Sequence, residues 1–506
     1  MSKNIAKDCP KYYLLEKQIA KVSQLSNLAA LVSWDCATML RPGSAHARQE
    51  ELATLHEIIH DLSTSDELGD LIQAAAANES LLDDWQKSNL KLIQRSFQEA
   101  GSIAPEMKRE LSIASSACEF MWRQCKANND FKTLAPYLDR VFSASIAISK
   151  AVADKFDKST YEILVQSFDP DRQISEIKQV YDVLKKELPV LIGQIIQKQS
   201  SQKVIKLTSP ISQDTQKAIG LKVLEKMGFD LNRGRLDKSA HPFCTGSRSD
   251  TRITTRYDKN NFLSSLLGVI HEAGHGLYQQ NLPEKYTSQP VGAAKGMAFH
   301  ESQSLIMEMQ ACSSYQFAEF LAKLLKDDFG LSGLEYSGDN LYKLMTRVRP
   351  SFIRVDADEV TYPLHVILRF DIEQEIVSGN IDKAADLPEI WNNKMSQYLG
   401  IMPDSYAQGC LQDIHWPSGL LGYFPSYTNG AIIASMLMQS AIKQDANIYS
   451  QFVHGDFSAL NKYLNNNLRE YGSLKSSQEL LLAATGKEKI DAVVFLDYLK
   501  QKYLND

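Results

Sequence analysis

The sequence predicts a mainly α-helical protein with one small β-sheet, and three observations support this fold class. Residues 11–205 contain a succession of segments in which apolar residues recur three and four positions apart, the period of an amphipathic helix. Residues 251–257 alternate instead, which is the period of a strand. An apolar run at 261–280 then ends in the six letters HEAGHG. The short sheet is therefore expected directly before a buried helix.

The first half of the chain is expected to be a helical scaffold. Helices are expected at 12–34, 47–62, 83–100, 105–127 and 171–199. The connection after the first of them is less regular, and Trp34, Asp35, Arg41 and Arg48 could reach a cleft from it. A connection between two helices, with surface charges, explains these residues more simply. After residue 430 the sequence returns to amphipathic helices.

The composition is that of an ordinary soluble globular chain. The 506 residues are 44% hydrophobic and 23% charged, with a net charge of −6. No block of like charge is long enough to bind nucleic acid, and no run of about 18 apolar residues could cross a membrane. The first residues lack the apolar core of a signal peptide, so we expect a cytoplasmic location. The seven scattered cysteines form no C-x-x-C pair, which is typical of reduced structural thiols.

The motif HEAGH at 271–275 predicts a metal site. On a helix, His271 and His275 lie one turn apart and project from the same face, about 5–6 Å apart between Cβ atoms. Two neutral imidazoles bind Zn²⁺ well, and Glu272 beside them can take a proton from a water that the metal activates. The alternative is a pair of histidines satisfied inside a core helix. The apolar stripe that precedes them offers few polar partners for that role.

A zinc site of this kind needs a third protein ligand, which we expect to be Glu301. It lies beside His300 in the apolar segment KGMAFHESQSLIMEMQ. Adjacent helical residues diverge by about 100°, so only one of the two can face the metal squarely. Ser302, Gln303 and Ser304 can orient the ligands. We expect one Zn²⁺ per chain, although Co²⁺ also suits this ligand set.

The predicted strand at 251–257 indicates a substrate class. A strand edge beside the metal can hold an extended peptide through backbone hydrogen bonds. Peptides are therefore the leading substrate class.

Six motifs, in order along the chain, carry a resemblance to a known family. They are HPF at 241–243, D-x-R-x-T at 250–254, HEAGH at 271–275, HESQ at 300–303, IRVDADEVTYPLHVILR at 353–369 and GCLQDIHW at 409–416. Together they resemble the thermostable carboxypeptidase Taq family of zinc metallocarboxypeptidases. The resemblance implies a two-lobed helical metallopeptidase with a deep active-site cleft, often a homodimer. It also implies removal of single residues from peptide C-termini with broad specificity.

On this resemblance the whole chain, 1–506, is expected to be a single peptidase domain. Residues 1–205 would form the helical scaffold lobe, 206–430 the catalytic region with the short sheet and the metal helices, and 431–506 the C-terminal helices.

A carboxypeptidase must recognise the terminal carboxylate of its substrate, and the planar fork of an arginine does this best. Arg354 is the expected anchor, both from its acidic segment and from the family's I-R-x-x-A-D-E pattern. Arg252 is a competitor that we keep among the substrate-binding residues. Arg369 is another competitor, but a structural ion pair explains it better.

Further residues of the motifs are expected to hold the ligating and substrate-binding groups in place. A helix is expected to begin at Pro363 and to end at Gly379, which places His365 in its first turn. This supporting set comprises His300, Gln303, His365, Asp358 and Asp413.

Hydrolysis also needs a proton carrier and donors to the oxyanion. Glu272 can act as base in the first step and as acid in the second. For the oxyanion we expect His415 and one tyrosine of GLLGYFPSYTNG, either Tyr423 or Tyr427. Tyr423 is assigned to catalysis, and Tyr427 is assigned with His241 to substrate binding.

Two other functions stay open at this stage. An oligopeptidase that cleaves internal bonds of short peptides would share the metal chemistry and differ in ignoring the terminal carboxylate. A non-catalytic, metal-containing peptide-binding protein is the second alternative, but His271, Glu272, His275 and Glu301 are all intact.

Overall fold

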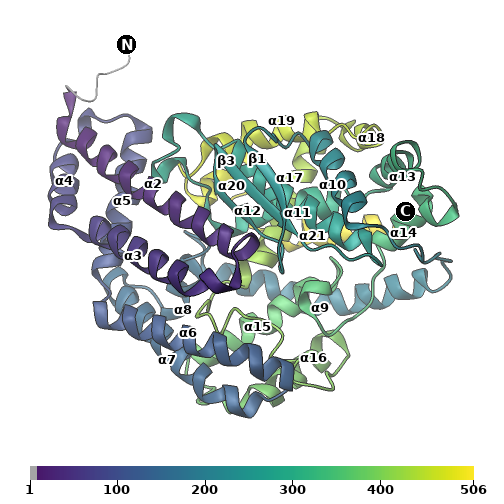
Figure 1. The fold of residues 1–506 in the computed structure, drawn as a ribbon, viewed down its shortest axis with the longest axis horizontal. Helices are drawn as coiled ribbons and strands as arrows, with labels where there is room; N and C mark the ends of the chain where they lie inside the picture. The colour runs from purple at the N-terminus through teal and green to yellow at the C-terminus, as the bar shows by residue number, and fades with distance from the viewer. Residues whose placement is uncertain (1–7, 506) are drawn as a thin grey trace.

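The computed structural model describes residues 8–505. Its N-terminal part is helical, as expected (Figure 1). The helices α6 and α7 pack against each other as a long antiparallel pair. The elements of this part are α2 Pro10–Thr38, α3 Ala45–Thr64, α4 Asp66–Ala76, α5 Asp84–Gly101, α6 Pro105–Asn128, α7 Phe131–Phe156, α8 Thr160–Gln166, α9 Ile174–Gln199 and α10 Gln213–Met227.

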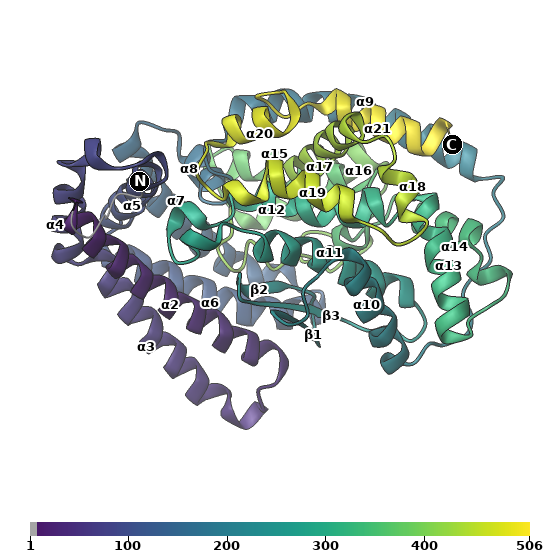
Figure 2. The same cartoon turned by 90° about the horizontal axis from the view of Figure 1, so that it is seen from above.

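The first helices of the chain have a small hydrophobic core of their own. Tyr12 and Leu15 of α2 pack there with Leu71 of α4 and Leu90 of α5. Figure 2 shows α2 to α5 on one side of the body that contains the sheet. The main core takes over from α6 onward. The boundary between the small core and the main core thus lies near residue 100. The expected scaffold lobe runs to residue 205, and that boundary stays a prediction.

One three-stranded sheet lies against the helix that carries His271 and His275. It consists of β1 Gly234–Lys238, β2 Cys244–Ser247 and β3 Asp250–Thr255, in the order β1-β3-β2. β1 runs parallel to β3, and β2 runs antiparallel to it, which leaves β2 at an edge. The hydroxyl of Thr255 donates to the carbonyl of Ser265 in the following helix at 3.1 Å, and this contact fixes the sheet to that helix.

The predicted strand is present, but it ends at Thr255, so Tyr257 lies beyond it. The backbone at Tyr257 leaves the sheet because the partner strand β1 ends at Lys238, which pairs with Thr255. Within the described residues the fold is otherwise helical. The predicted class, mainly α with one small sheet beside the metal-binding helix, is confirmed.

The middle of the chain supplies the helices that position the site. The first of them begins with an N-cap, in which the side chain of Asn261 accepts from the amide of Ser264 at 3.3 Å. The predicted helix from 363 to 379 begins one residue earlier and ends at Val377, with Pro363 in its first turn. These elements are α11 Phe262–Gln280, α12 Gly296–Leu305, the π-helix η5 Ile306–Ala311, α13 Tyr315–Phe329, α14 Gly338–Met345, α15 Tyr362–Val377 and α16 Leu387–Leu399.

The C-terminal helices pack over the middle of the chain, including α12. α17 packs along α12, and α21 packs against α17 and α9. No helix in residues 8–505 is both long and apolar enough to span a membrane. All seven cysteines are free thiols, as expected. The elements are α17 Pro425–Gln444, α18 Ile448–Phe452, α19 Ser458–Asn467, α20 Ser477–Thr485, α21 Ala492–Lys500 and the π-helix η10 Gln501–Asn505.

Candidate metal centre and active site

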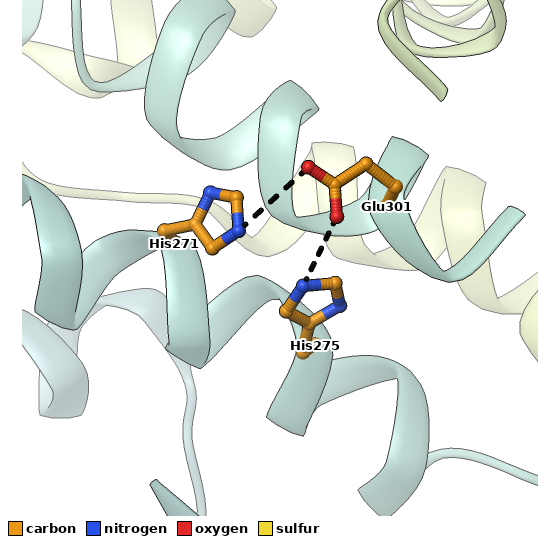
Figure 3. A group of neighbouring side chains, drawn as sticks. All are labelled: His271, His275 and Glu301. Atoms are coloured by element: carbon orange, nitrogen blue, oxygen red, sulfur yellow. Dashed lines mark ion pairs between the residues drawn. The ribbon is translucent and has the colours of Figure 1, made fainter. Parts of the chain in front are cut away.

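Three expected ligands converge between α11 and α12. His271 and His275 project from one face of α11 toward Glu301 of α12 (Figure 3). Glu301 Oε1 lies 3.8 Å from His271 Nε2, and its Oε2 lies 3.4 Å from His275 Nε2. One ligand atom from each residue falls within 4.8 Å of the other two. Tetrahedral ligation with bonds of about 2.0–2.2 Å separates donor atoms by about 3.3–3.6 Å, so this set can hold a zinc ion.

In both His271 and His275, the Nδ1 atom, which points away from Glu301, has a partner that fixes the tautomer of the ring. His271 Nδ1 donates to Glu308 Oε2 at 2.7 Å, and this bond leaves Nε2 free to accept a metal. His275 Nδ1 lies 2.6 Å from His300 Nδ1. Burial, together with His275, holds the pKa of His300 well below its usual value. His300 is therefore neutral and can accept the proton of His275 Nδ1.

The charges of the site favour cation binding. Burial alone lowers the pKa of His271, but Glu301 and Glu308 outweigh it and raise the value to about 10. Burial raises the pKa of Glu301, yet His271, His275 and Arg354 together lower it below the usual value. Without a metal, the carboxylates thus hold a proton on His271. A divalent cation that binds there displaces this proton.

Glu272 is buried next to the edge strand of the sheet. Burial raises its pKa above the usual value, and His271 and His275 partly oppose this shift. Cys244, the first residue of β2, lies close enough for the charge of Glu272 to raise the pKa of its thiol further. The edge strand β2, which also packs against α2 and α11, therefore begins near the carboxylate that we expect to act as base.

Two glycines allow the helices to approach the ligands closely. A Cβ on Gly274 would lie 2.3 Å from the carbonyl oxygen of Gln303, at the crossing of α11 and α12. A Cβ on Gly430 of α17 would lie 2.7 Å from Cβ of Glu301. Larger residues at either position would push the third ligand away from the histidines.

Arg354 and Arg369 share one buried carboxylate. Arg354 Nε and Nη2 donate to Asp413 Oδ1 at 3.1 and 3.0 Å. Arg369 Nε donates to Asp413 Oδ2 at 2.7 Å, and its Nη2 makes a second bond to the same oxygen. The two guanidiniums depress the pKa of Asp413 far below its usual range despite its burial. Two positive charges thus face one negative charge.

Aromatic side chains enclose Arg354. Its Nη1 donates to the hydroxyl of Tyr362 at 2.6 Å, and its guanidinium lies 4.8 Å from the ring centroid of Tyr427. His415 Nε2 lies 3.1 Å from the hydroxyl of Tyr427. Burial and the charge of Arg354 lower the pKa of His415 to about 3, so its ring is neutral. Tyr423 packs against the rings of His415 and Tyr427, at 5.4 and 5.3 Å between centroids.

Three expected site residues have their contacts with residues outside this group, or are exposed. The guanidinium of Arg252 pairs with Asp250 at 2.9 Å and lies 4.3 Å from the ring centroid of Trp34. His241 is exposed in the connection between β1 and β2. Gln303 accepts from Arg469 Nε at 2.8 Å, on the side of α12 away from the ligands.

The other two supporting residues occupy the Arg354 region. Asp358 Oδ1 accepts from the amides of Val360 and Thr361, each at 3.0 Å, and so shapes the turn before α15. His365 is fully buried, and burial together with Arg369 and Arg354 lowers its pKa to about 3. Its carbonyl accepts from Arg369 Nη1 at 2.5 Å.

Sequence reasoning did not identify Glu308, Tyr362, Gly274 or Gly430. Glu308 had a signal, because it is the next acidic residue after Glu301 on the same helical segment and faces α11. Gly274 also had one, since a glycine between two ligating histidines allows a second helix to cross closely. The contacts of Tyr362 and Gly430 depend on how distant segments pack, which no local pattern indicates.

The comparisons with known proteins agree with this geometry. Residues 14–503 match the family model described as carboxypeptidase Taq (M32) metallopeptidase. Thermostable carboxypeptidase 1 of Pyrococcus furiosus is 32% identical over 490 residues, covering 96% of both chains. Carboxypeptidase 1 of Bacillus subtilis is 31% identical over 490 residues, covering 96% of this chain and 97% of that one.

Solved structures give the same result for the fold. Trypanosoma cruzi metallocarboxypeptidase 1 superposes with a TM-score of 0.95 at 33% identity, covering 98% of this chain and 99% of that one. The M32 carboxypeptidase of Deinococcus radiodurans R1 superposes with a TM-score of 0.92 at 29% identity, with the same coverage. These similarities support a metallocarboxypeptidase activity, a divalent metal and peptide substrates. The chain belongs to the carboxypeptidase Taq (M32) family of metallopeptidases.

Proposed function

We propose that this chain is a zinc-dependent metallocarboxypeptidase that removes single C-terminal residues from peptides with broad specificity. The observation that carries the proposal is the pair of buried arginines, Arg354 and Arg369, which share Asp413 near the ligand cluster. Within residues 8–505, Asp413 is the one carboxylate in ion-pair contact with either guanidinium. The two guanidiniums thus have one carboxylate between them at ion-pair distance, and the terminal carboxylate of a peptide would supply a second.

His271, His275 and Glu301 would hold the metal, one ion per chain, and their donor set also suits Co²⁺. When bound, the metal supplies Lewis-acid activation of water and of the scissile carbonyl. Glu308 and His300 keep the two histidines in the tautomer that presents Nε2 to the site.

Glu272 would move the proton. It would take one from the attacking water and pass it to the leaving nitrogen. Its raised pKa suits this role, since a base whose pKa lies closer to neutrality can also act as an acid in the next step. The electrostatic contact of Glu272 with Cys244, the first residue of β2, supports this role if a peptide binds along that strand.

Arg354 would anchor the terminal carboxylate, and Tyr427 with His415 would stabilise the oxyanion. Tyr427 is supported over Tyr423 by two contacts, with His415 Nε2 and with the guanidinium of Arg354. Tyr423 packs behind both rings and would hold them in place. A role for Arg252 or His241 in substrate binding stays a prediction, as do the homodimer and the cytoplasmic location.

The test is release of the C-terminal amino acid from a blocked dipeptide and from its C-terminal amide, by the zinc-loaded protein. We expect cleavage of the free acid alone. The Arg354→Met variant should lose about 10- to 150-fold in kcat/KM on the acid, the value of one charge-assisted contact of about 1.5–3 kcal/mol. Asp413 would stay paired with Arg369 in this variant, so we expect it to fold. Arg123→Met, on the exposed surface of α6, is the matched control.

Equal cleavage of acid and amide would contradict the proposal and indicate an oligopeptidase. Bound zinc with no cleavage of either substrate would indicate a non-catalytic peptide-binding protein.

A further inference from the structure

The C-terminal turn of the chain places a buried cation next to the active-site elements. Lys502 lies in η10, and only 9% of its side chain is exposed. Its Nζ lies 2.7 Å from Glu359 Oε1 and donates to the carbonyl of Met309 at 2.7 Å. Tyr498, one turn earlier, lies within hydrogen-bond distance of the same two residues, at 3.1 Å from each. Two segments from the middle of the chain therefore meet at one lysine near its end.

The first of these segments is the π-helix η5. Met309 follows Glu308, the residue that accepts the proton of His271 Nδ1. The carbonyl of Met309 lies in the last turn of η5, where backbone acceptors have no partner within the helix. Lys502 and Tyr498 supply the donors for it. Single π-turns inside helices are rare and occur often at functional sites, where they change the direction of a side chain.

The second segment joins Arg354 to the start of α15. Glu359 lies between Arg354 and Tyr362, which are themselves hydrogen-bonded at 2.6 Å. The side chain of Glu359 is 5% exposed, and Lys502 is the one cation within ion-pair distance of it among residues 8–505. Removing one partner of such a buried pair leaves an uncompensated charge, which is relieved either by protonation of Glu359 or by movement of the segment, and both break the ion pair that holds the segment to Lys502.

We propose that Lys502 is a positioning residue of the active site, which holds the π-helix that carries Glu308 and the segment that carries Arg354 in one fixed arrangement. Tyr498 is its hydrogen-bonding partner in this role. The inference rests on the proposed function for the roles of Glu308 and Arg354. It extends the site to the last helical turn of the chain, more than a hundred residues beyond either segment in sequence.

The test measures zinc affinity, by competition between the protein and a chromophoric chelator for Zn²⁺ alone. Lys502→Met should weaken Zn²⁺ binding about tenfold, the lower end of the effect seen when the partner of a ligating histidine is disturbed. At saturating Zn²⁺, KM for a blocked free-acid dipeptide should rise more than kcat falls, because the anchor for the carboxylate is displaced. Lys502→Arg, which keeps a charged donor, should recover most of both effects. Lys500→Met is the matched control, since this lysine, the last residue of α21, is exposed.

A purely structural role would give a different result. Lys502→Met would then lower the unfolding temperature, while Zn²⁺ affinity and KM, measured well below that temperature, would equal those of Lys500→Met. That outcome overturns the inference. If Lys502→Met does not fold, Tyr498→Phe removes one hydroxyl and keeps the ring, and it should weaken Zn²⁺ binding severalfold. Unchanged affinity in Tyr498→Phe would equally overturn the inference.

Zinc affinity does not depend on which peptide bond is cut, so the two proposals can fail separately. Weaker Zn²⁺ binding in Lys502→Met, in a protein that cleaves acid and amide alike, would support the inference and contradict the carboxypeptidase proposal. Wild-type affinity in Lys502→Met, in a protein that cleaves the acid alone, would do the reverse.

Discussion

Glu308 provides a quantitative test of how the metal site is held. Its carboxylate makes one charge-assisted hydrogen bond, at 2.7 Å, to Nδ1 of His271. Such bonds contribute about 1.5–3 kcal/mol, which corresponds to about 10- to 150-fold in affinity. Loss of a carboxylate partner behind a ligating histidine costs about 10- to 100-fold in metal affinity, and the two ranges agree. Glu308→Ala should therefore weaken Zn²⁺ binding about 100-fold.

Glu308→Gln should have a smaller effect, about tenfold, because the amide oxygen can still accept the proton without the negative charge. The assay is chelator competition at fixed pH, with Glu57→Gln on the exposed face of α3 as the control for loss of one carboxylate. Binding of Zn²⁺ by Glu308→Ala within twofold of the wild type would refute this role of Glu308. Equal losses in both variants would show that the charge carries the whole effect.

Two further predictions concern stability. Gly274→Ala should lower the free energy of unfolding by about 1–3 kcal/mol, because the new Cβ would meet the carbonyl oxygen of Gln303 at 2.3 Å. Gly193→Ala in α9, where nothing lies within 4 Å of the new Cβ, should instead raise the free energy of unfolding by up to about 1 kcal/mol. Thermal unfolding should therefore show a lower midpoint for Gly274→Ala and a higher one for Gly193→Ala. Burial raises the pKa of Glu373 from 4.5 to about 7 in the folded protein. The folded protein therefore binds this proton more tightly than the unfolded chain does. The resulting stabilisation is fully present below pH 4.5 and is lost as the pH rises through 7. Wild type should therefore lose about 2 kcal/mol relative to Glu373→Gln between pH 5 and pH 7.5 in urea titrations, and a constant difference across that range would contradict the assignment.

The ligand helix was predictable because its information is local. The period of an α-helix alone places His271 and His275 on one face, and an apolar stripe indicates that this face is buried. Glu301 could be proposed because an acidic residue in an otherwise apolar helix needs a partner. The strand at β3 was visible in its alternation, whereas β1, with the sequence GRLDK, has buried positions only at Leu236 and Asp237 and shows no such pattern.

The rest of the site depends on packing between segments that are distant in the sequence. Asp413 contacts Arg354 and Arg369, which lie 59 and 44 positions before it in the sequence. No spacing rule indicates which arginines a carboxylate at such separations will meet. Arg252 was a competitor of Arg354 in sequence, and its guanidinium lies over the ring of Trp34 of α2, a contact that no local pattern indicates. Glu308 lies seven positions, about two helical turns, after Glu301, but which residue of another helix it meets depends on how α11 crosses this segment.

The most direct test of the central claim is release of amino acid from a blocked free-acid dipeptide by zinc-loaded wild type and by Glu272→Gln, with bound zinc measured in both. Glutamine keeps the shape of the side chain but cannot carry the proton, so the variant should bind zinc as the wild type does and lose at least about 100-fold in kcat. A variant that retains wild-type kcat with zinc bound would contradict the assignment of Glu272 as the proton carrier and, with it, the proposed mechanism.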